Sequence, residues 1–469
     1  MTTDGAIVSS RLACAMSDSL RVAVVGSGPA GFYAADALLR SEEPAVEVDV
    51  VDRLPTPWGL VRLGVAPDHE NIKAVSRAFE RTAARPGFRF FGNVEVGSTV
   101  SHEELLELYD AVVYTVGAQT DRRLGVPGED LPGSWPATAF VAWYNGHPDF
   151  QDCEFNLDVE RVVVIGNGNV AIDCARMLAL TAEELAPTDT TDEAVEAIVS
   201  APIREIVMLG RRGPVQAAFT PPELKELGEL AGADVVVDPR DLELDPISAR
   251  ELQADLQRAG RNVETLRDYA ARQPTGKPRR IVLRFLVSPT AIVGDGRVEG
   301  VEVVRNELVE DGGRLVARPT GETELIPAGL VLRSVGYKGV PLPGVPFDER
   351  SGTIPNDGGR VRGAERTYAA GWIKRGPSGV IGTNKKDAVE TVEHLLEDAR
   401  AGRLRRGGAG TLEGLLDAKG VEYVEYEGWQ AIDAAERSAG EPLGRPRVKL
   451  HRWERLLDVG RRTPAAGER

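Results

Sequence analysis

RVAVVGSGPAG, residues Arg21–Gly31, is a short apolar run that enters a glycine-rich turn. The run Arg21–Gly26 is rich in valine and bounded by glycine, which is typical of a buried parallel strand. Beyond the turn, Ala30 and Leu38 recur at helical spacing on one face. A second valine-rich run, Val46–Asp52, follows. The order of these segments predicts a strand–helix–strand unit whose two strands run parallel.

The turn GSGPAG matches the pattern G-x-G-x-x-G at a junction between a strand and a helix. Gly26 permits the tight turn, Gly28 lets the backbone approach a pyrophosphate, and Gly31 allows close packing of helix on strand. The N-terminus of the helix adds free N–H groups that favour a phosphate. Asp52 ends the next strand, where a carboxylate accepts hydrogen bonds from ribose hydroxyls. We therefore predict a dinucleotide-binding site in this unit.

The same pattern recurs in RVVVIGNGNVA, residues Arg161–Ala171, with alanine in the third glycine position. The strand predicted next, REIVMLG, leads into Arg211 and Arg212 rather than an acid. Guanidinium groups bind a ribose 2′-phosphate through paired hydrogen bonds, whereas a carboxylate would repel it. The second site is therefore predicted to prefer NADP to NAD. Two nucleotide sites of opposite charge indicate a flavoprotein that takes a hydride from NADPH.

Length and composition limit what else the chain could be. Its 469 residues suffice for two or three domains, and hydrophobic residues at 42% with charged residues at 27% fit a folded globular protein. The 56 lysines and arginines against 72 acidic residues give a net charge of −16, which argues against nucleic-acid binding. No apolar run approaches the ~20 residues of a membrane span. We expect a cytoplasmic monomer that is not inserted in a membrane.

The rest of the chain extends this pattern. Residues 1–18 show no periodicity and are expected to form an unstructured leader, with Met16 as an alternative start. YDAVVYTVG (Tyr109–Gly117) predicts a further buried strand, and later runs such as LVLRSVG predict strands of the second unit. The acidic stretch Thr188–Glu196 predicts a helix with a solvated face, and WQAIDAAERSAG predicts a C-terminal helical region.

Several longer segments carry a family resemblance. They read LPTPWGLVRLGVAPDH, FFGNVEVG, VIGNGNVAIDCAR, GRRGPVQAAFT and GWIKRGPSGVIGTNKKDA, and with VVGSGPAG they run in family order from about Arg21 to Arg447. The chain resembles the adrenodoxin reductase family, the mitochondrial-type NADPH–ferredoxin reductases, and most of all their actinobacterial branch. The resemblance implies an NADPH-dependent FAD enzyme that passes electrons one at a time to an iron–sulfur ferredoxin.

The fold that this family implies is α/β, with two Rossmann-like three-layer nucleotide-binding domains. Its NADP domain is inserted into a discontinuous FAD domain. Mapped onto this sequence, the FAD domain comprises residues 19–120 and 336–469, the latter with the C-terminal helical region, and the NADP domain comprises residues 121–335. The Tyr109–Gly117 strand and LVLRSVGYKG would then be the two crossings between the domains.

The resemblance also assigns nucleotide contacts by position. Those predicted for FAD, with the glycines of the first turn, are Gly26, Gly28, Ala30, Gly31, Asp52, Leu60, Val96, Trp372, Gly379, Val380 and Ile381. Those predicted for NADP(H) are Arg122, Asn167, Gly168, Asn169, Val170, Arg211, Arg212, Glu223 and Gly379. GVIGTNKKDAVETVEHLL reads as a loop that enters a helix, whose N-terminus would point at the flavin N1 edge. Where the family commonly has glutamate at the ribose carboxylate, this chain has Asp52.

Two groups are candidates for proton chemistry beside the flavin. His69 closes GVAPDH, and histidine titrates near neutral pH. Glu223 and Glu226 are three residues apart on a predicted helix, so Glu226 could pair with His69 while Glu223 contacts the nicotinamide ribose. We predict His69 and Glu226 as the catalytic residues; the alternative is a structural histidine and a solvated glutamate. The sequence shows no metal-ligating cluster, and hydride transfer needs none.

An acidic reductase needs a local basic surface to bind an acidic ferredoxin. Four arginines in one helical-looking segment are candidates, with the first two as the principal prediction: Arg258, Arg261, Arg267 and Arg272. The alternative is a solvated helix face.

Other classes of protein stay open at this stage. A disulfide reductase has two similar nucleotide sites but needs a redox dithiol, and Cys14, Cys153 and Cys174 form no C-x-x-C pair. A flavin monooxygenase shares the fold class, although the family segments disfavour it. An NADPH diaphorase or flavin reductase would use an acceptor other than ferredoxin. A non-enzymatic NADPH-binding sensor would have lost its flavin and would be colourless.

Overall fold

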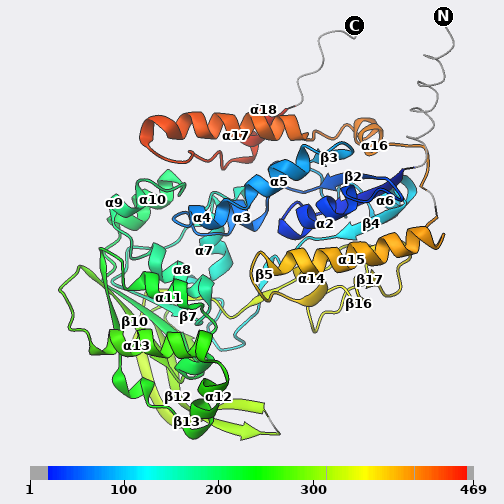
Figure 1. Cartoon of the computed structure of the whole chain (residues 1–469). Coiled ribbons are helices and arrows are strands. Elements are labelled where there is room, and N and C mark those ends of the chain that lie inside the picture. The colour runs from blue at the N-terminus through cyan, green and yellow to red at the C-terminus, as the bar shows by residue number, and fades with distance from the viewer. Residues whose placement is uncertain (1–18, 313, 406, 462–469) are drawn as a thin grey trace, which may run out of the picture.

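The structure is a computed structural model of the chain, and it describes residues 19–312, 314–405 and 407–461. The predicted leader, residues 1–18, lies outside these ranges. Within them we find no helix that combines the length and the apolar character needed for a membrane crossing. Two sheets with helices packed against them form the two main parts of the molecule, one at the upper right of Figure 1 and one at the lower left.

The first sheet has seven strands, with β1 parallel to β2 on one side and to β4 on the other. In spatial order the strands are β16 (Asn356–Asp357), β17 (Arg360–Val361), β18 (Thr367–Ala369), β4 (Ala111–Tyr114), β1 (Leu20–Val25), β2 (Val46–Val51) and β3 (Phe88–Phe91). The central strands are almost wholly buried on both faces, which explains why their sequences are continuous valine-rich runs rather than alternating ones.

The second sheet has six strands, all parallel to their neighbours. In spatial order they are β6 (Ser134–Pro136), β14 (Leu330–Arg333), β7 (Arg161–Ile165), β8 (Glu205–Gly210), β10 (Arg279–Phe285) and β9 (Ala233–Val237). A separate antiparallel sheet of β11 (Val287–Val293), β12 (Gly300–Asp311) and β13 (Arg314–Pro327) projects from this part at the bottom of Figure 1.

The strands of the first sheet come from both ends of the chain, and the second sheet lies between them in sequence. The two connecting segments contain β5 (Thr120–Asp121) and β15 (Tyr337–Lys338), which pair with each other as antiparallel strands. The predicted fold class is therefore confirmed: one dinucleotide-binding domain is inserted into a second dinucleotide-binding domain, which is discontinuous in sequence. The domain bounds 19–120, 121–335 and 336–469 stay predictions.

Helices pack against both sheets and around the boundary between the two parts. In chain order the α-helices are α2 (Pro29–Leu39), α3 (Leu60–Leu63), α4 (Glu70–Lys73), α5 (Ser76–Ala83), α6 (His102–Leu108), α7 (Ala137–Tyr144), α8 (Asn169–Met177), α9 (Ala182–Leu185), α10 (Asp192–Ser200), α11 (Pro221–Leu227), α12 (Pro246–Ala254), α13 (Arg261–Ala271), α14 (Trp372–Arg375), α15 (Thr383–Arg400), α16 (Leu412–Ala418), α17 (Tyr426–Gly440) and α18 (Trp453–Gly460).

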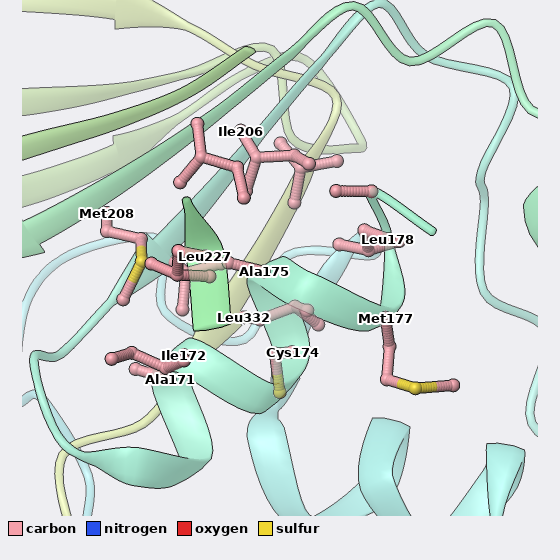
Figure 2. Packing of buried hydrophobic residues seen from close by; sticks show 14 of the residues in the cluster. Ala171, Ile172, Cys174, Ala175, Met177, Leu178, Ile206, Met208, Leu227 and Leu332 are labelled. Carbon is pink, nitrogen blue, oxygen red and sulfur yellow. The ribbon is translucent and has the colours of Figure 1, made fainter. Parts of the chain in front are cut away.

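The core of the inserted part forms where α8 lies on the second sheet (Figure 2). Ile172 and Ala175 of α8 pack with Ile206 and Met208 of β8, and all four are buried. Cys174 belongs to the same apolar cluster, so its thiol is a packing group. This packing fixes the direction in which α8 leaves the glycine-rich turn that precedes it.

The acidic stretch Thr188–Glu196 does not form the single solvated helix that the sequence predicts. Helix α10 begins only at Asp192, and residues 188–191 are buried. Asp189 contacts Lys73 Nζ at 2.6 Å and Lys449 Nζ at 3.2 Å, so it joins α4 of the first domain and the C-terminal segment. The prediction was wrong here because the partners of Asp189 are more than a hundred residues away in sequence.

Candidate functional site

The first glycine-rich turn has the geometry that its sequence predicts. Gly26 has a φ of +105°, and a Cβ on Gly31 would lie 2.0 Å from the carbonyl oxygen of Gly26. Both positions therefore exclude larger residues for reasons internal to the fold. A Cβ on Gly28 would meet nothing within 4 Å, so this stretch of backbone is open to a bound group. The turn thus offers the cradle that a pyrophosphate needs.

Asp52 faces this turn from the end of β2. Its Oδ2 accepts hydrogen bonds from the backbone N–H and the hydroxyl of Ser27 at 2.7 and 2.6 Å, and its Oδ1 accepts one from Leu54 N at 2.9 Å. Burial raises the pKa of Asp52, while these hydrogen bonds oppose that rise. The carboxylate is therefore held beside Gly28 as a ribose-binding group would be.

The segments predicted to meet a flavin converge on the same turn. A Cβ on Gly371, which precedes α14, would lie 2.6 Å from Ala30 Cβ, so α2 and the start of α14 are in close contact. Trp372 follows directly and its ring lies 5.4 Å from that of Tyr337. Gly379 has a φ of +79°, and Val380 is exposed just before α15 begins.

Two further predicted contacts differ in exposure. Leu60 is exposed and follows Gly59, whose Cβ would lie 3.0 Å from Gly28 Cα. Val96 is buried and pairs with Val100 in an isolated bridge. Leu60 is thus close to the first turn, whereas Val96 is mainly a core residue.

The second glycine-rich turn repeats the first one. Gly166 has a φ of +141° and a Cβ there would lie 2.1 Å from Ser334 O, whereas a Cβ on Gly168 would meet nothing within 4 Å. Asn169 Oδ1 accepts a hydrogen bond from Thr220 N at 2.9 Å, just before α11. The neighbouring Asn167 accepts hydrogen bonds at its carbonyl from residues 218 and 219. Both asparagines thus fix the start of α11 against the second turn, and Val170 is half-buried beside them.

Arg211 and Arg212 follow the end of β8, close to this second turn. Arg211 is exposed and Arg212 is half-buried. Within the described ranges neither guanidinium has a hydrogen-bond or ion-pair partner. Two unpaired cations at this point of a dinucleotide fold suit a phosphate. Arg122 lies just beyond β5, is exposed, and donates to Ser351 O at 3.3 Å.

An ionisable cluster joins the two domains. His69, the residue before α4, lies with its Nε2 2.8 Å from Glu226 Oε2 and 3.9 Å from Glu223 Oε2. Both glutamates come from one face of α11, as their spacing predicts. Burial, with the nearby Asp173 carboxylate, raises the pKa of Glu223 to about 7. A group that changes charge near neutral pH therefore lies beside the His69–Glu226 contact.

The cluster contains three groups that the sequence analysis missed: Asp68, Asp173 and Arg176. His69, Asp173 and Glu223 bring potential metal-ligand atoms within 4.8 Å of one another. However, the Arg176 guanidinium contacts Asp173 Oδ1 at 3.0 Å and Glu223 Oε2 at 3.4 Å. An internal cation already balances these carboxylates. The absence of a metal site stays a prediction.

The four candidate arginines for partner binding lie on two consecutive elements. Arg258 precedes α13 and is tied down, because its Nη1 donates to Ala217 O at 2.6 Å and its Nη2 pairs with Asp255 at 2.9 Å. Arg261, Arg267 and Arg272 of this region are exposed. Glu264 and Asp268 are exposed on the same helix, so the surface mixes both signs of charge.

Two dinucleotide turns, one in each domain, together with an ionisable cluster at the domain boundary are features of a pyridine-nucleotide-dependent oxidoreductase. Residues 20–209 match the family model described as pyridine nucleotide-disulphide oxidoreductase. The chain is 53% identical over 451 residues to the NADPH-ferredoxin reductase FprA of Mycobacterium tuberculosis, covering 94% of this chain and 98% of that protein. The chain belongs to the adrenodoxin reductase family of NADPH–ferredoxin reductases, as its sequence segments predict.

A plant relative and a solved structure agree with this assignment. The mitochondrial NADPH:adrenodoxin oxidoreductase of Arabidopsis thaliana is 41% identical over 472 residues, covering 96% of this chain and 97% of that protein. The structure of Mycobacterium tuberculosis FprA in complex with NADPH superposes with a TM-score of 0.91 at 52% identity, covering 94% of this chain and 99% of that one. Among the described residues Cys153 and Cys174 are both free, and Cys174 is packed in the core of the inserted domain.

Proposed function

We propose that the protein is an NADPH-dependent FAD flavoprotein that takes a hydride from NADPH onto FAD and passes electrons singly to an iron–sulfur ferredoxin. The observation that carries this proposal is the pair of dinucleotide turns, the first with a carboxylate beside it and the second with two arginines, in domains that the His69–Glu226 contact joins. Relatives that cover almost the whole chain are named as reductases of ferredoxin and adrenodoxin.

The first site fits FAD. Gly28 offers open backbone for the pyrophosphate, and Asp52 offers a half-buried carboxylate for the ribose. FAD, when bound, accepts both electrons of a hydride and releases them one at a time. We assign the flavin side to Trp372 and to residues 379–381, where the positive end of the α15 dipole favours negative charge. Leu60 would cover the same side.

The second site fits NADPH as the substrate. Gly168 leaves room for the pyrophosphate, and Arg211 and Arg212 would bind the 2′-phosphate. We place the nicotinamide ribose at Glu223, which sits on the helix that Asn169 caps. The further contacts that we propose are Arg122, Asn167, Val170 and Gly379.

His69 and Glu226 would manage the proton that accompanies the redox step. Paired with the Glu226 carboxylate, His69 can hold a proton at Nε2, and the contact lies at the boundary of the two domains. The imidazole is largely buried whereas the Glu226 side chain is 40% exposed, so Glu226 would carry the proton between His69 and water.

For the acceptor we propose a ferredoxin that binds at the exposed arginines of α13. Arg261 and Arg267 are the stronger candidates, because Arg258 is already paired with Asp255. A diaphorase or flavin reductase, the alternative, would use a small acceptor and no such surface. We propose in addition that the protein works in the cytoplasm as a monomer and does not bind nucleic acid.

The test is anaerobic mixing of the purified yellow protein with NADPH, followed by addition of oxidised ferredoxin. We expect the flavin absorbance to bleach with NADPH far faster than with NADH, and to recover as ferredoxin is reduced. Replacing Arg261 and Arg267 with alanine should flatten the salt dependence of ferredoxin turnover, whereas Arg297→Ala, at an exposed arginine elsewhere in the domain, should not. Bleaching without ferredoxin reduction would favour the diaphorase, and a colourless protein the sensor.

A further inference from the structure

We propose that Arg176 is a positioning residue that holds the His69–Glu226 pair and the Glu223 carboxylate in place across the domain boundary for hydride transfer. This inference rests on the proposed transfer from NADPH to FAD. In that step the C4–H bond of NADPH breaks and the hydride carries both electrons to the flavin, which leaves a positive charge on the nicotinamide ring.

The contacts of Arg176 converge from both domains. Its Nε and Nη2 donate to the two oxygens of Asp68, at 2.8 and 3.0 Å, so the pair is bidentate. Asp68 belongs to the first domain, whereas Arg176 belongs to α8 of the inserted one. Its Nη1 lies 3.4 Å from Glu223 Oε2 and 3.5 Å from Glu226 Oε2. One guanidinium thus touches the carboxylates on both sides of the boundary.

Arginine suits this place for reasons of shape and charge. Its side chain is only 2% exposed, and a buried cation is costly unless several anions surround it. A planar guanidinium offers five N–H groups in fixed directions, which a lysine ammonium cannot match. Without it, the carboxylates of Asp68, Asp173, Glu223 and Glu226 would repel one another. The arginine therefore sets both the spacing and the charge of the cluster.

The ionisation of the carboxylates depends on this cation. Burial alone would raise the pKa of Asp68, but the hydrogen bond and charge of Arg176 outweigh it, so that its pKa is lowered. Burial raises the pKa of Asp173. Burial and the nearby Asp173 carboxylate raise the pKa of Glu223 to about 7, while the charges of His69 and Arg176 oppose the rise at Glu223. Three further titratable groups interact electrostatically with Asp173: Tyr144, Cys174 and Tyr337. Burial raises the pKa of each, which keeps all three neutral.

The functional consequence concerns Glu223. An ionised carboxylate near the nicotinamide stabilises the positive charge that forms as the hydride leaves. The rate of flavin reduction should therefore rise with pH through the pKa of Glu223. Removing Arg176 takes away a cation that lowers this pKa, so the rise should move to higher pH.

The experiment compares Arg176→Met and Arg176→Lys with the wild-type holoprotein. Lys73→Met is the matched control, because Lys73 lies in α4 and also bridges the domains, through Asp189, without touching the cluster. For each protein we would measure the rate of flavin reduction by NADPH, and by calorimetry the affinity for NADP⁺, across the neutral pH range. NADP⁺ carries the positive ring, so its affinity follows the ionisation of Glu223 whether or not the protein is an active reductase.

We expect a wild-type midpoint near 7 in both profiles. Arg176→Met should move it upward by about one pH unit or more, and Arg176→Lys by less. Lys73→Met should leave it unchanged. Should Arg176→Met not fold, Glu223→Gln serves instead and should abolish the transition while preserving the fold.

Unchanged midpoints in the Arg176 variants would overturn the inference. A shift in Lys73→Met as large as that in Arg176→Met would also overturn it, because it would show that the midpoint responds to any loss of domain alignment. A transition that persists in Glu223→Gln would overturn it too. If NADP⁺ affinity shifts as expected but NADPH does not reduce the flavin, the proposed function fails. The part of the inference that then stands is that Arg176 holds the carboxylates in place and sets the ionisation of Glu223.

Discussion

Replacing Arg211 and Arg212 with alanine should remove most of the preference for NADPH over NADH without weakening the fold. Both side chains follow β8 beside the second glycine-rich turn, and within the described ranges neither guanidinium is engaged with another residue. Their removal therefore breaks no internal hydrogen bond or ion pair among the described residues. It removes only the groups that we assign to the 2′-phosphate, the one part of NADPH that NADH lacks.

The magnitude follows from the exposure of the two side chains. A hydrogen bond to a charged group contributes about 1.5–3 kcal/mol. Both arginines are reachable by water and salt, so the lower end of that range applies to each. Together they should supply about 3 kcal/mol of discrimination, which corresponds to roughly a 100-fold change in the ratio of kcat/KM values. Arg212→Ala should cost more than Arg211→Ala, because Arg212 is half-buried and thus better ordered.

The assay is steady-state reduction of an artificial acceptor with NADPH and with NADH, at low and at high salt. The change should appear in kcat/KM for NADPH, with that for NADH nearly constant, and it should shrink as salt rises. Arg297→Ala, at an exposed arginine without a partner in the described part of the same domain, is the control. A double variant that keeps the wild-type ratio of NADPH to NADH efficiency would refute the assignment of the 2′-phosphate to these residues.

Three more predictions concern the fold around the site. Gly28→Ala should fold normally but lose bound flavin, because the added Cβ would occupy the open space that we assign to the pyrophosphate. Gly31→Ala should lower the melting temperature, because its Cβ would lie 2.0 Å from the carbonyl oxygen of Gly26. Flavin absorbance measures the first effect and a thermal scan the second. Arg62→Met should destabilise the protein by about 1.5–3 kcal/mol in urea unfolding, because the buried Glu436 loses its bidentate partner at 2.5 and 2.8 Å and keeps, among the described residues, only Arg447 at 3.1 Å and the backbone N–H of Leu450. Two lysines outweigh burial and hold the pKa of Asp189 well below its ordinary value. The Asp189 carboxylate therefore stabilises the fold at pH values above its unfolded pKa of ~3.9, and this contribution is lost as the pH falls through its folded pKa. Asp189→Asn should therefore make the free energy of unfolding depend less on pH in the acid range.

The parts of the fold that the sequence predicts well are those with local causes. A glycine turn requires specific backbone angles and close approaches, and residues within a few positions of Gly26 and Gly166 supply both. The strands around them are buried on both faces, so their valine runs identify them. The shared face of Glu223 and Glu226 was also predictable from local sequence, because their helical spacing alone places both side chains on one side of α11.

The ionic cluster could not be assembled in this way, because its members come from three distant segments. One signal for Arg176 was nevertheless present in NVAIDCARMLAL: the arginine lies four residues after Ile172, on a helix whose neighbouring side chains are apolar. A cation in such a helix needs buried anions. Helical spacing in the sequence indicates Asp173, one turn earlier, as a candidate partner of Arg176. It does not indicate Asp68, which lies in the other domain and contacts Arg176 at 2.8 Å only because of how the two domains are arranged.

The placement of the two nucleotide sites relative to each other depends on this insertion. The domains are connected by the short pair β5–β15, and a pair of two-residue strands cannot by itself fix an orientation. Ion pairs add contacts across the boundary, among them Arg176 with Asp68 and Lys73 with Asp189. Buried ion pairs contribute little net stability but are demanding in distance and direction, so they favour one arrangement over others. A hydride moves only between atoms held about 3–3.5 Å apart, and an apolar interface that could slide would not guarantee this. The ionic boundary is therefore best understood as the element that sets the transfer distance.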